Sequence, residues 1–363
     1  MRFTVSIKKF SQALGVVARV ANSRASLPIL SNVLIKAEKN RVYVSATNLN
    51  IASQIFIGSK VEKDGAVTIP ARLLQEYISA LDGDTVDIEV KDNKTNISTD
   101  LHKTVINGVD ASEFPEMPEI SNESSWEIPS TLLKKYFSAT IVCASTDDTK
   151  PILNSVYVFS EKNQTIFAAT DGYRLAEQKA NNKSPQPIKL IIPSNSVAEL
   201  IRVLPDDETD VIIKTNEQLA EFNFGDTKII TRLIDGSFPD YKNLIPKDFV
   251  NSAKLGRQEL ANTTKLAGLF ARDTSGSINI TTDEKNQTLG IKTIASQTGQ
   301  NESTVPAEVV GTSDITINAR YINDALGQIG SEQAEISFNE KLQPCVIKGD
   351  DPNYLQVIMP LKS

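Results

Sequence analysis

The chain has 363 residues, of which 40% are apolar and 23% charged, and its formal net charge is −7. This length allows two or three cores of ordinary domain size, and the acidic balance argues against a simple basic coat for nucleic acid. One histidine and two cysteines exclude a disulfide framework and a cysteine-rich zinc site, and they disfavour a histidine-dependent triad.

No stretch of the sequence approaches the apolar run that a membrane span requires. The first nine residues, Met-Arg-Phe-Thr-Val-Ser-Ile-Lys-Lys, lack the apolar core of a signal peptide. The glycines form no phosphate-cradling motif. We therefore expect a cytoplasmic protein with no membrane partner and no cofactor or metal.

The first third of the chain predicts an α+β unit. A strand that leads into a helix is expected over residues 5–20. Residues 69–78 end a strand at a proline and begin a second helix, with apolar residues at spacings of three and four. An acidic turn at 82–84 and a β run at 86–90 follow. One unit thus holds two helices and about eight short strands.

The same pattern returns later in the chain. Leu-Pro-Ile-Leu-Ser-Asn-Val-Leu-Ile at 27–35 has a counterpart at 150–158, and the run that opens Ala-Thr-Asn at 46 has one that opens Ala-Thr-Asp at 169, both displaced by 123 positions. The helix start at 69–78 recurs at 192–201 and again at 317–326. Because independent motifs agree on one displacement, the sequence predicts three copies of one unit.

Proline-containing exits mark the ends of the first two copies. They read Phe-Pro-Glu-Met-Pro at 114–118 and Asp-Gly-Ser-Phe-Pro-Asp-Tyr at 235–241, and each runs into a linker. The third copy stops at an apolar strand with a short tail, at 356–363. We place the domains at 1–124, 125–251 and 252–363.

Residues 169–176, Ala-Thr-Asp-Gly-Tyr-Arg-Leu-Ala, follow a strand-like run. Gly172 stands where a sharp bend needs backbone freedom. A tight, hydrogen-bonded turn is the structural interpretation. Asp171, Tyr173 and Arg174 could alternatively form an acid-base cluster, but no nucleophile-base pair accompanies them.

Tandem copies whose sheet edges pair with the next copy either extend as a filament or close, and closed symmetric assemblies are the usual outcome. Basic residues gather on the predicted helices: the helical stretches at 8–20 and 131–143 carry lysine or arginine and no acid. If the helices line the inner wall of a closed ring, that wall is positive although the chain is acidic.

The width of the ring argues for two chains. Two chains of three copies, with two helices each, supply twelve helices. At about 9 Å between neighbouring axes, and less about 10 Å for helix bulk, they leave an opening of about 24 Å, against about 7 Å for one chain. Only the wider opening passes a nucleic-acid duplex, so we expect a head-to-tail homodimer with sequence-independent, salt-sensitive phosphate contacts.

Over essentially its whole length the sequence resembles the bacterial DNA polymerase III beta subunits, the sliding clamps. The resemblance rests on the three-copy layout, the runs at 27–30, 169–176 and 235–241, and the Val-Ile-Met-Pro-Leu ending at 357–361. It implies the DNA clamp fold and a ring-shaped processivity factor that has no catalytic site of its own. It also implies as partners duplex DNA, the replicative polymerase alpha subunit, the clamp loader, and other polymerases and repair proteins that carry a clamp-binding peptide.

The family binds these partners through an apolar pocket between the second and third domains, where apolar walls hold the anchor side chains of a peptide. Carried over by motif, the pocket comprises Leu153, Thr170, Gly172, Tyr173, Arg174, Leu175, Pro239, Leu244, Asn318, Tyr321, Val357, Met359, Pro360 and Leu361. Tyr173 stands where some relatives have histidine.

Two further groups of residues complete the expected sites. The DNA-facing set is Lys8, Lys9, Arg24, Arg72, Lys134, Lys135, Arg202 and Lys265. Each of these lysines alone reads as an ordinary solvated side chain, so the prediction concerns their summed field. The dimer interface is assigned to Ile106, Leu269 and Phe270, by position in the family and because exposed apolar edges need a cover.

Two other classes of function stay open at this point. One is an enzyme of nucleotide or sugar chemistry with its site at Asp171. The other is a repeat scaffold that binds peptides but no DNA. Met359 and Leu361 could then be plain core residues.

Overall fold

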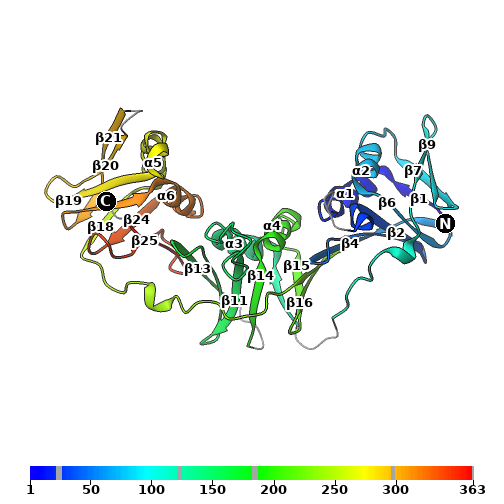
Figure 1. Ribbon diagram of the computed structural model, residues 1–363, viewed down its shortest axis with the longest axis horizontal. Helices are drawn as coiled ribbons and strands as arrows, with labels where there is room; N and C mark the ends of the chain where they lie inside the picture. The colour runs from blue at the N-terminus through cyan, green and yellow to red at the C-terminus, as the bar shows by residue number, and fades with distance from the viewer. Residues whose placement is uncertain (22–26, 121–124, 182–186, 296–298, 362–363) are drawn as a thin grey trace. The chain divides into compact units, whose positions relative to one another are not determined.

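The structure, a computed structural model, describes residues 1–21, 27–120, 125–181, 187–295 and 299–361 (Figure 1). The chain forms two compact units, Met1–Thr131 with Arg202–Leu233, and Leu132–Ile201 with Ile234–Ser363.

The first unit contains two antiparallel sheets. The five-stranded sheet has the order β5 (Lys60–Lys63), β1 (Arg2–Ser6), β7 (Thr85–Lys91), β8 (Lys94–Ser98) and β9 (Lys103–Asn107). The eight-stranded sheet has the order β10 (Ser125–Pro129), β15 (Asp210–Thr215), β16 (Leu219–Phe224), β17 (Thr227–Arg232), β4 (Ile51–Gly58), β3 (Arg41–Thr47), β2 (Asn32–Glu38) and β6 (Gly65–Pro70).

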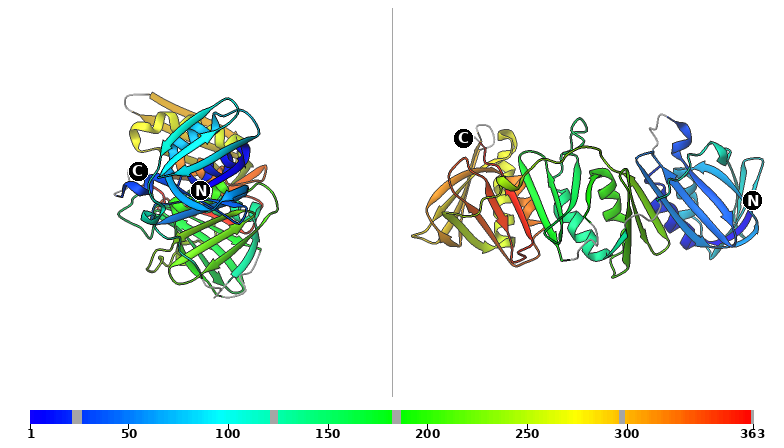
Figure 2. Two further views of the ribbon diagram at one scale, coloured as in Figure 1. Left: turned by 90° about the vertical axis from the view of Figure 1, so that its right-hand side faces the viewer. Right: turned by 90° about the horizontal axis from the view of Figure 1, so that it is seen from below.

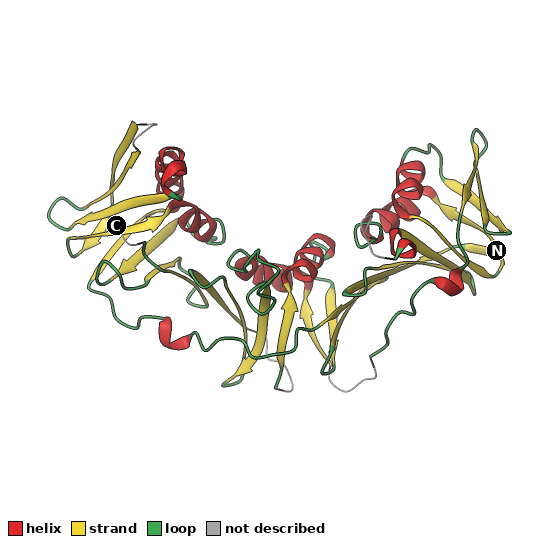
Figure 3. Cartoon of the chain, in the orientation of Figure 1, coloured by secondary structure: helices red, strands yellow, loops and turns green. Residues whose placement is uncertain are grey.

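Helices α1 (Ile7–Val17) and α2 (Ala71–Ser79) lie side by side against these sheets (Figure 3). Their apolar faces supply fully buried side chains, among them Phe10, Leu14, Leu74 and Ile78. Pro70 ends β6 immediately before α2, where its fixed φ suits a helix start and its missing N–H has no intrahelical partner to lose. Short 3₁₀ turns span Pro28–Ser31 and Ala111–Glu113.

The second unit also contains two antiparallel sheets. The nine-stranded sheet has the order β14 (Lys189–Pro193), β11 (Ser155–Glu161), β12 (Gln164–Thr170), β13 (Arg174–Ala180), β26 (Tyr354–Ile358), β25 (Cys345–Lys348), β24 (Gln333–Phe338), β18 (Asn251–Gly256) and β22 (Glu308–Val310). The four-stranded sheet has the order β21 (Gly299–Pro306), β20 (Thr288–Ala295), β19 (Ser277–Asp283) and β23 (Ser313–Asn318). Helices α5 (Arg257–Phe270) and α6 (Ala319–Leu326) pack on each other.

The remaining helices, α3 (Ser130–Ile141) and α4 (Ser194–Val203), belong to the second predicted copy. The described residues therefore contain two α-helices in each copy, as the sequence predicts, with nine, eight and nine strands. Strand β10 begins at the proposed boundary after residue 124, and β18 begins one residue before the proposed boundary after residue 251. The boundaries themselves stay a proposal.

Strand pairing joins neighbouring copies. In the first unit, β17 of the second copy pairs antiparallel with β4 of the first copy, with Ile230 opposite Ala52. In the second unit, β13 of the second copy pairs antiparallel with β26 of the third copy, seen as neighbouring green and red strands in Figure 2. Leu175 lies opposite Val357 in this pairing. The expectation that sheet edges of successive copies pair is thus confirmed. We call the β4–β17 pairing the first junction and the β13–β26 pairing the second junction.

Both cysteines are interior residues. Cys143 and Cys345 are buried and free, and burial raises the pKa of each thiol well above its usual value. Within the described residues, no cluster of histidine, cysteine and acidic side chains could hold a metal ion. None of the helices described in the structure combines the length and the apolar character of a membrane span.

Two serines near the first junction provide a test of this packing. The buried Ser53 Oγ has no hydrogen-bond partner among the described residues, whereas the buried Ser45 Oγ accepts a hydrogen bond from Gln54 Nε2 at 3.0 Å. An unpaired buried hydroxyl costs roughly 1–3 kcal/mol of desolvation. We predict that Ser53→Ala leaves the free energy of unfolding unchanged or raises it by up to about 1 kcal/mol, and that Ser45→Ala lowers it by about 1 kcal/mol.

Calorimetric melting of the two variants beside the parent chain measures this difference. An equal loss of stability in both variants would contradict the packing described for Ser53.

Candidate functional site

Residues 170–174 form a turn that its own side chains hold. Thr170 Oγ1 donates to the Arg174 carbonyl at 2.7 Å and accepts from the Gly172 N–H at 3.1 Å. Asp171 Oδ1 accepts from the N–H groups of Tyr173 and Arg174 at 2.9 and 3.0 Å. Gly172 has φ +91°, in the left-handed region that glycine enters without steric cost. The tight, hydrogen-bonded turn predicted from the sequence is confirmed.

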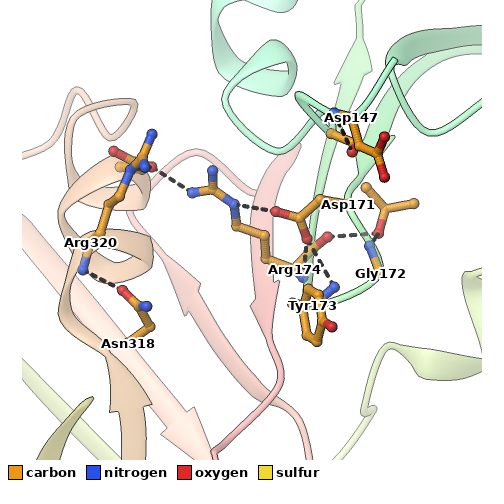
Figure 4. Close-up of polar contacts among 10 residues, drawn as sticks. Asp147, Asp171, Gly172, Tyr173, Arg174, Asn318 and Arg320 are labelled. Carbon is orange, nitrogen blue, oxygen red and sulfur yellow. Dashed lines mark hydrogen bonds and ion pairs between the residues drawn. The ribbon is translucent and has the colours of Figure 1, made fainter. Parts of the chain in front are cut away.

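Arg174 connects this turn to helix α6 (Figure 4). Its side chain is only 6% exposed; Nε lies 3.0 Å from Asp171 Oδ2, and a terminal guanidinium nitrogen lies 2.5 Å from Asp324 Oδ2. The guanidinium carbon also lies 4.3 Å from the centre of the Tyr321 ring. Burial by itself lowers the pKa of Arg174, but its bonds to Asp324 and Asp171 outweigh burial and raise that pKa. The Arg174 side chain is therefore a buried positive charge, held in place by carboxylates of the turn and of α6.

The C-terminal strand brings the tail of the chain to the same place. After β26, the Met359 N–H donates to the Tyr173 carbonyl at 2.8 Å. The Leu361 N–H then donates to the Thr316 carbonyl of β23, also at 2.8 Å. Asn318 ends β23 and caps α6 by accepting from the Arg320 N–H at 2.9 Å. Three distant segments thus meet at the second junction.

An apolar cluster lies at this junction. Leu175 and Val357 are buried with Tyr241, and Phe238 packs against them. The Tyr241 hydroxyl donates to Glu177 Oε2 at 2.6 Å. Burial and then the charge of Glu177 raise the pKa of Tyr241. The turn at 235–241 is therefore fastened to the second junction by both apolar and polar contacts.

The predicted pocket residues differ in exposure. Arg174, Leu175 and Val357 are buried, so their contribution is to position their neighbours. Leu153, Thr170, Asn318, Tyr321, Met359, Pro360 and Leu361 are partly exposed. Gly172, Tyr173, Pro239 and Leu244 are exposed. We call the partly exposed and exposed members the second-junction surface.

Not every member of this surface has a direct contact with the turn at 170–174. Leu153 follows Ile152, whose side chain packs against Gly236. Leu244 follows Tyr241 in the 3₁₀ turn Lys242–Leu244 and is 55% exposed. Leu153 and Leu244 are therefore linked to the second junction by their neighbours Ile152 and Tyr241, which contact or belong to the turn at 235–241.

The sequence did not reveal the partner of Arg174. Asp324 lies 150 positions away, and only its i,i+4 spacing from Arg320, an ion pair at 3.7 Å, marked it as part of a charged helix face. Both carboxylate oxygens of Asp171 are engaged by its own turn and by Arg174. This engagement argues against Asp171 as an acid-base centre.

The basic residues predicted to face DNA have varied surroundings. Lys8 and Lys9 on α1 and Lys265 on α5 are exposed. Arg72 pairs with Glu76 at 2.8 Å, so a phosphate would compete with that carboxylate. Lys135 likewise pairs with Asp351 at 3.0 Å.

The other members of the set complete this picture. Lys134 is partly exposed, and Arg202 is exposed in the last turn of α4. Arg24 lies outside the described residues.

The interface assignment of Ile106, Leu269 and Phe270 stays a prediction. Ile106 lies on the edge strand β9, and its side chain is only 6% exposed. Its neighbours Val105 and Leu101 are 56% and 83% exposed. Side chains alternate between the two faces of a strand, so a shift of one position exchanges the buried and exposed sets. On α5, Leu269 is 48% exposed, and Phe270 is partly exposed.

The ion pair between Arg174 and Asp324 predicts a measurable coupling energy between these two side chains. Because removing one partner of a buried ion pair strands the other charge, we expect Arg174→Gln to lower the free energy of unfolding by roughly 2–4 kcal/mol. Asp324→Asn, at a more exposed carboxylate, should cost about 1 kcal/mol. Urea unfolding of both variants and of the double variant gives the coupling energy. Purely additive losses would show that the two side chains act independently.

Comparison with known families agrees with the domain order. The N-terminal, central and C-terminal domain models of the DNA polymerase III beta subunit match residues 1–118, 127–240 and 242–362. Among curated proteins, the chain is 28% identical over its whole length to the beta sliding clamp of Synechococcus elongatus, covering 99% of that protein. It is 27% identical to the beta sliding clamp of Bacillus subtilis, with 100% of both chains covered.

Solved structures agree as well. A DNA polymerase sliding clamp from Bacillus subtilis matches with a TM-score of 0.95 and 26% identity, over 100% of this chain and 99% of that one. A DnaN sliding clamp from Bartonella birtlesii bound to griselimycin matches with a TM-score of 0.95 and 28% identity, over 100% of both chains. The clamp fold implied by the resemblance is therefore confirmed. The chain belongs to the DNA polymerase III beta subunit family, the sliding clamps, which serve DNA replication as processivity factors rather than as enzymes.

Proposed function

We propose that two copies of this chain join head to tail as a closed ring around duplex DNA and tether the replicative polymerase to its template. The observation that carries the proposal is the joining of three similar copies by strand pairing, with each copy matched by a different domain model of one clamp family. A ring retains DNA by topology, so it needs no strong or sequence-specific contact.

DNA contact is assigned to the basic helix residues. Lys8, Lys9 and Lys265 are exposed, so their ammonium groups are accessible from solvent. Arg24, Arg72, Lys134, Lys135 and Arg202 complete the proposed set. Contacts of this kind are independent of base sequence and weaken as salt rises.

The dimer contact is assigned to two exposed edges. Strand β9 ends the five-stranded sheet and exposes Val105, with Leu101 exposed just before it. Strand β21 ends the four-stranded sheet, beside α5 with Leu269 and Phe270. Unpaired strand edges and exposed apolar side chains both favour a partner. We therefore propose that β9 of one chain meets β21 and α5 of the other, with Ile106 supporting the interface from within.

Partner proteins are assigned to the second-junction surface. Exposed Tyr173 and Leu244, with the flexible side chain of Met359, suit the apolar anchors of a short peptide. A family member binds griselimycin, which is consistent with a ligand-accepting surface in this family. The proposed occupants are peptides of the polymerase alpha subunit, the clamp loader, and other polymerases and repair proteins. We propose that the protein does this work in the bacterial cytoplasm.

A retention assay tests the ring. The protein, loaded on nicked circular plasmid with a bacterial clamp loader, should stay bound at moderate salt and be lost within minutes of linearisation, because it slides off a free end. Val105→Glu should reduce retention on the circle, since it places a charge in the proposed apolar interface. Val250→Glu, the same substitution at a 70% exposed valine outside the proposed interface, is the charge control. Equal loss from circular and linear DNA would favour a scaffold that does not encircle DNA.

A binding assay tests the surface. We predict that Met359→Ala combined with Leu361→Ala weakens binding of a polymerase-derived peptide about tenfold or more, because two apolar anchors are removed. The fold should persist, since both side chains are partly exposed. Fluorescence anisotropy measures the affinity, and sedimentation checks that the dimer is retained. Unchanged affinity would remove these residues from the site.

A further inference from the structure

The first junction contains a cavity of about 170 Å³ in the first unit. It is lined by Thr47, Leu49, Asn50, Ile51, Ala52, Pro115, Glu116, Pro118, Gln218, Leu219, Ile230 and Arg232. These residues come from the end of β3, the loop to β4, the start of β4, the exit at 115–118, the residue before β16, and the strands β16 and β17. None of them belongs to the second-junction surface.

The loop that borders this cavity has the geometry of the turn at 170–174. Thr47 Oγ1 donates to the Ile51 carbonyl at 3.1 Å and accepts from the Leu49 N–H at 3.0 Å. Asn48 Oδ1 accepts from the N–H groups of Asn50 and Ile51 at 3.0 and 2.9 Å. Leu49 has φ +74°, where the later turn has glycine at +91°. Each of these features recurs 123 positions later, so the two turns are structural equivalents.

The partner strand is equivalent too. The Arg232 N–H donates to the Asn50 carbonyl at 2.8 Å. At the second junction, the Met359 N–H donates to the Tyr173 carbonyl at the same distance. Ile230 pairs with Ala52, as Val357 pairs with Leu175. The cavity therefore lies at the position that the second-junction surface occupies in the next copy.

The exit segments correspond as well. Pro115 lines the first cavity and follows a phenylalanine in the run 114–118, as Pro239 does in the run 235–241. Both prolines are followed by an acidic residue. The same three building blocks, turn, partner strand and proline exit, thus enclose both places.

The chemistry of the two places differs at one decisive position. Arg232 stands where the second junction has Met359, and it is exposed. Among the described residues its guanidinium has no carboxylate within ion-pair distance, although Glu116 also lines the cavity. Leu49, 45% exposed, and Leu219 provide apolar wall. An arginine next to apolar wall recognises a carboxylate beside an apolar side chain.

We propose that the first junction is a second peptide-binding site, and that it selects a linear segment in which an aspartate or glutamate adjoins an apolar anchor residue. The carboxylate bonds to Arg232, away from Glu116, and the anchor enters the cavity beside Leu49. This inference rests on the proposed function to the extent that it takes the second-junction surface as a peptide site. The ring can exist without it.

Photo-crosslinking tests the site on the whole 363-residue chain. The probe is a synthetic peptide with the core Leu-Asp-Leu, flanked by alanines and carrying a benzophenone group, and the matched peptide has asparagine in place of aspartate. We expect the aspartate peptide to label residues 47–52 or 115–118, as mapped by mass spectrometry. The asparagine peptide and the variant Arg232→Gln should each reduce this labelling about tenfold below saturation, because a charge-assisted contact is lost.

Two controls locate the effect. Arg2→Gln removes the same charge from an exposed residue of the five-stranded sheet and should leave labelling unchanged. The variant with Met359→Ala and Leu361→Ala should also retain it, because those residues belong to the other junction. Circular dichroism verifies that every variant is folded.

The outcomes separate the two proposals. Labelling confined to the second-junction surface, absence of labelling at millimolar probe, or equal labelling of Arg232→Gln and the parent chain would each overturn the second site. If the same preparation is still retained on circular DNA, the ring stands and only this inference fails. Loss of retention with labelling intact would overturn the ring instead.

Discussion

Antiparallel pairing between the edge strands of successive copies is the constraint on which the rest of the structure depends. It merges the sheets of two copies at each junction, and it sets which residues of the partner strand lie beside the turn. Register along a strand has a period of two, so a slip of one residue would turn every side chain to the opposite face. The position of Met359 beside Tyr173 follows from that register, as does the position of Arg232 beside Asn50.

On this common frame the two junctions carry different chemistry. At the second junction the positive charge is interior, because Arg174 is buried and held between Asp171 and Asp324. The partly exposed residues there include the apolar Met359 and Leu361. At the first junction the equivalent of Arg174 is Ile51, and the positive charge is the exposed Arg232. The two junctions therefore share their turn geometry and differ in where the positive charge lies.

Local features of the fold were predictable from the sequence, and long-range pairings were not. The helix starts and the turn at 170–174 depend on side chains within a few residues of each other, so spacing alone indicated them. The Arg174–Asp324 pair joins residues 150 positions apart, and no local pattern encodes it. Ile106 shows a different limit: the edge strand was identified, but the phase of its alternation, which decides that Val105 is the exposed residue, depends on packing against the unit. The resemblance to a family supplied the pocket residues that physical reasoning alone left ambiguous.

The burial of both cysteine thiols, Cys143 and Cys345, has a practical consequence. A cysteine reacts as its thiolate, and both thiols of this chain are withheld from solvent with ionisation suppressed. The native cysteines of the parent protein should therefore react only slowly with maleimide dyes. A single cysteine introduced at an exposed position would carry the label without removal of either native sulfur, so that movement along DNA can be followed on an otherwise unaltered molecule.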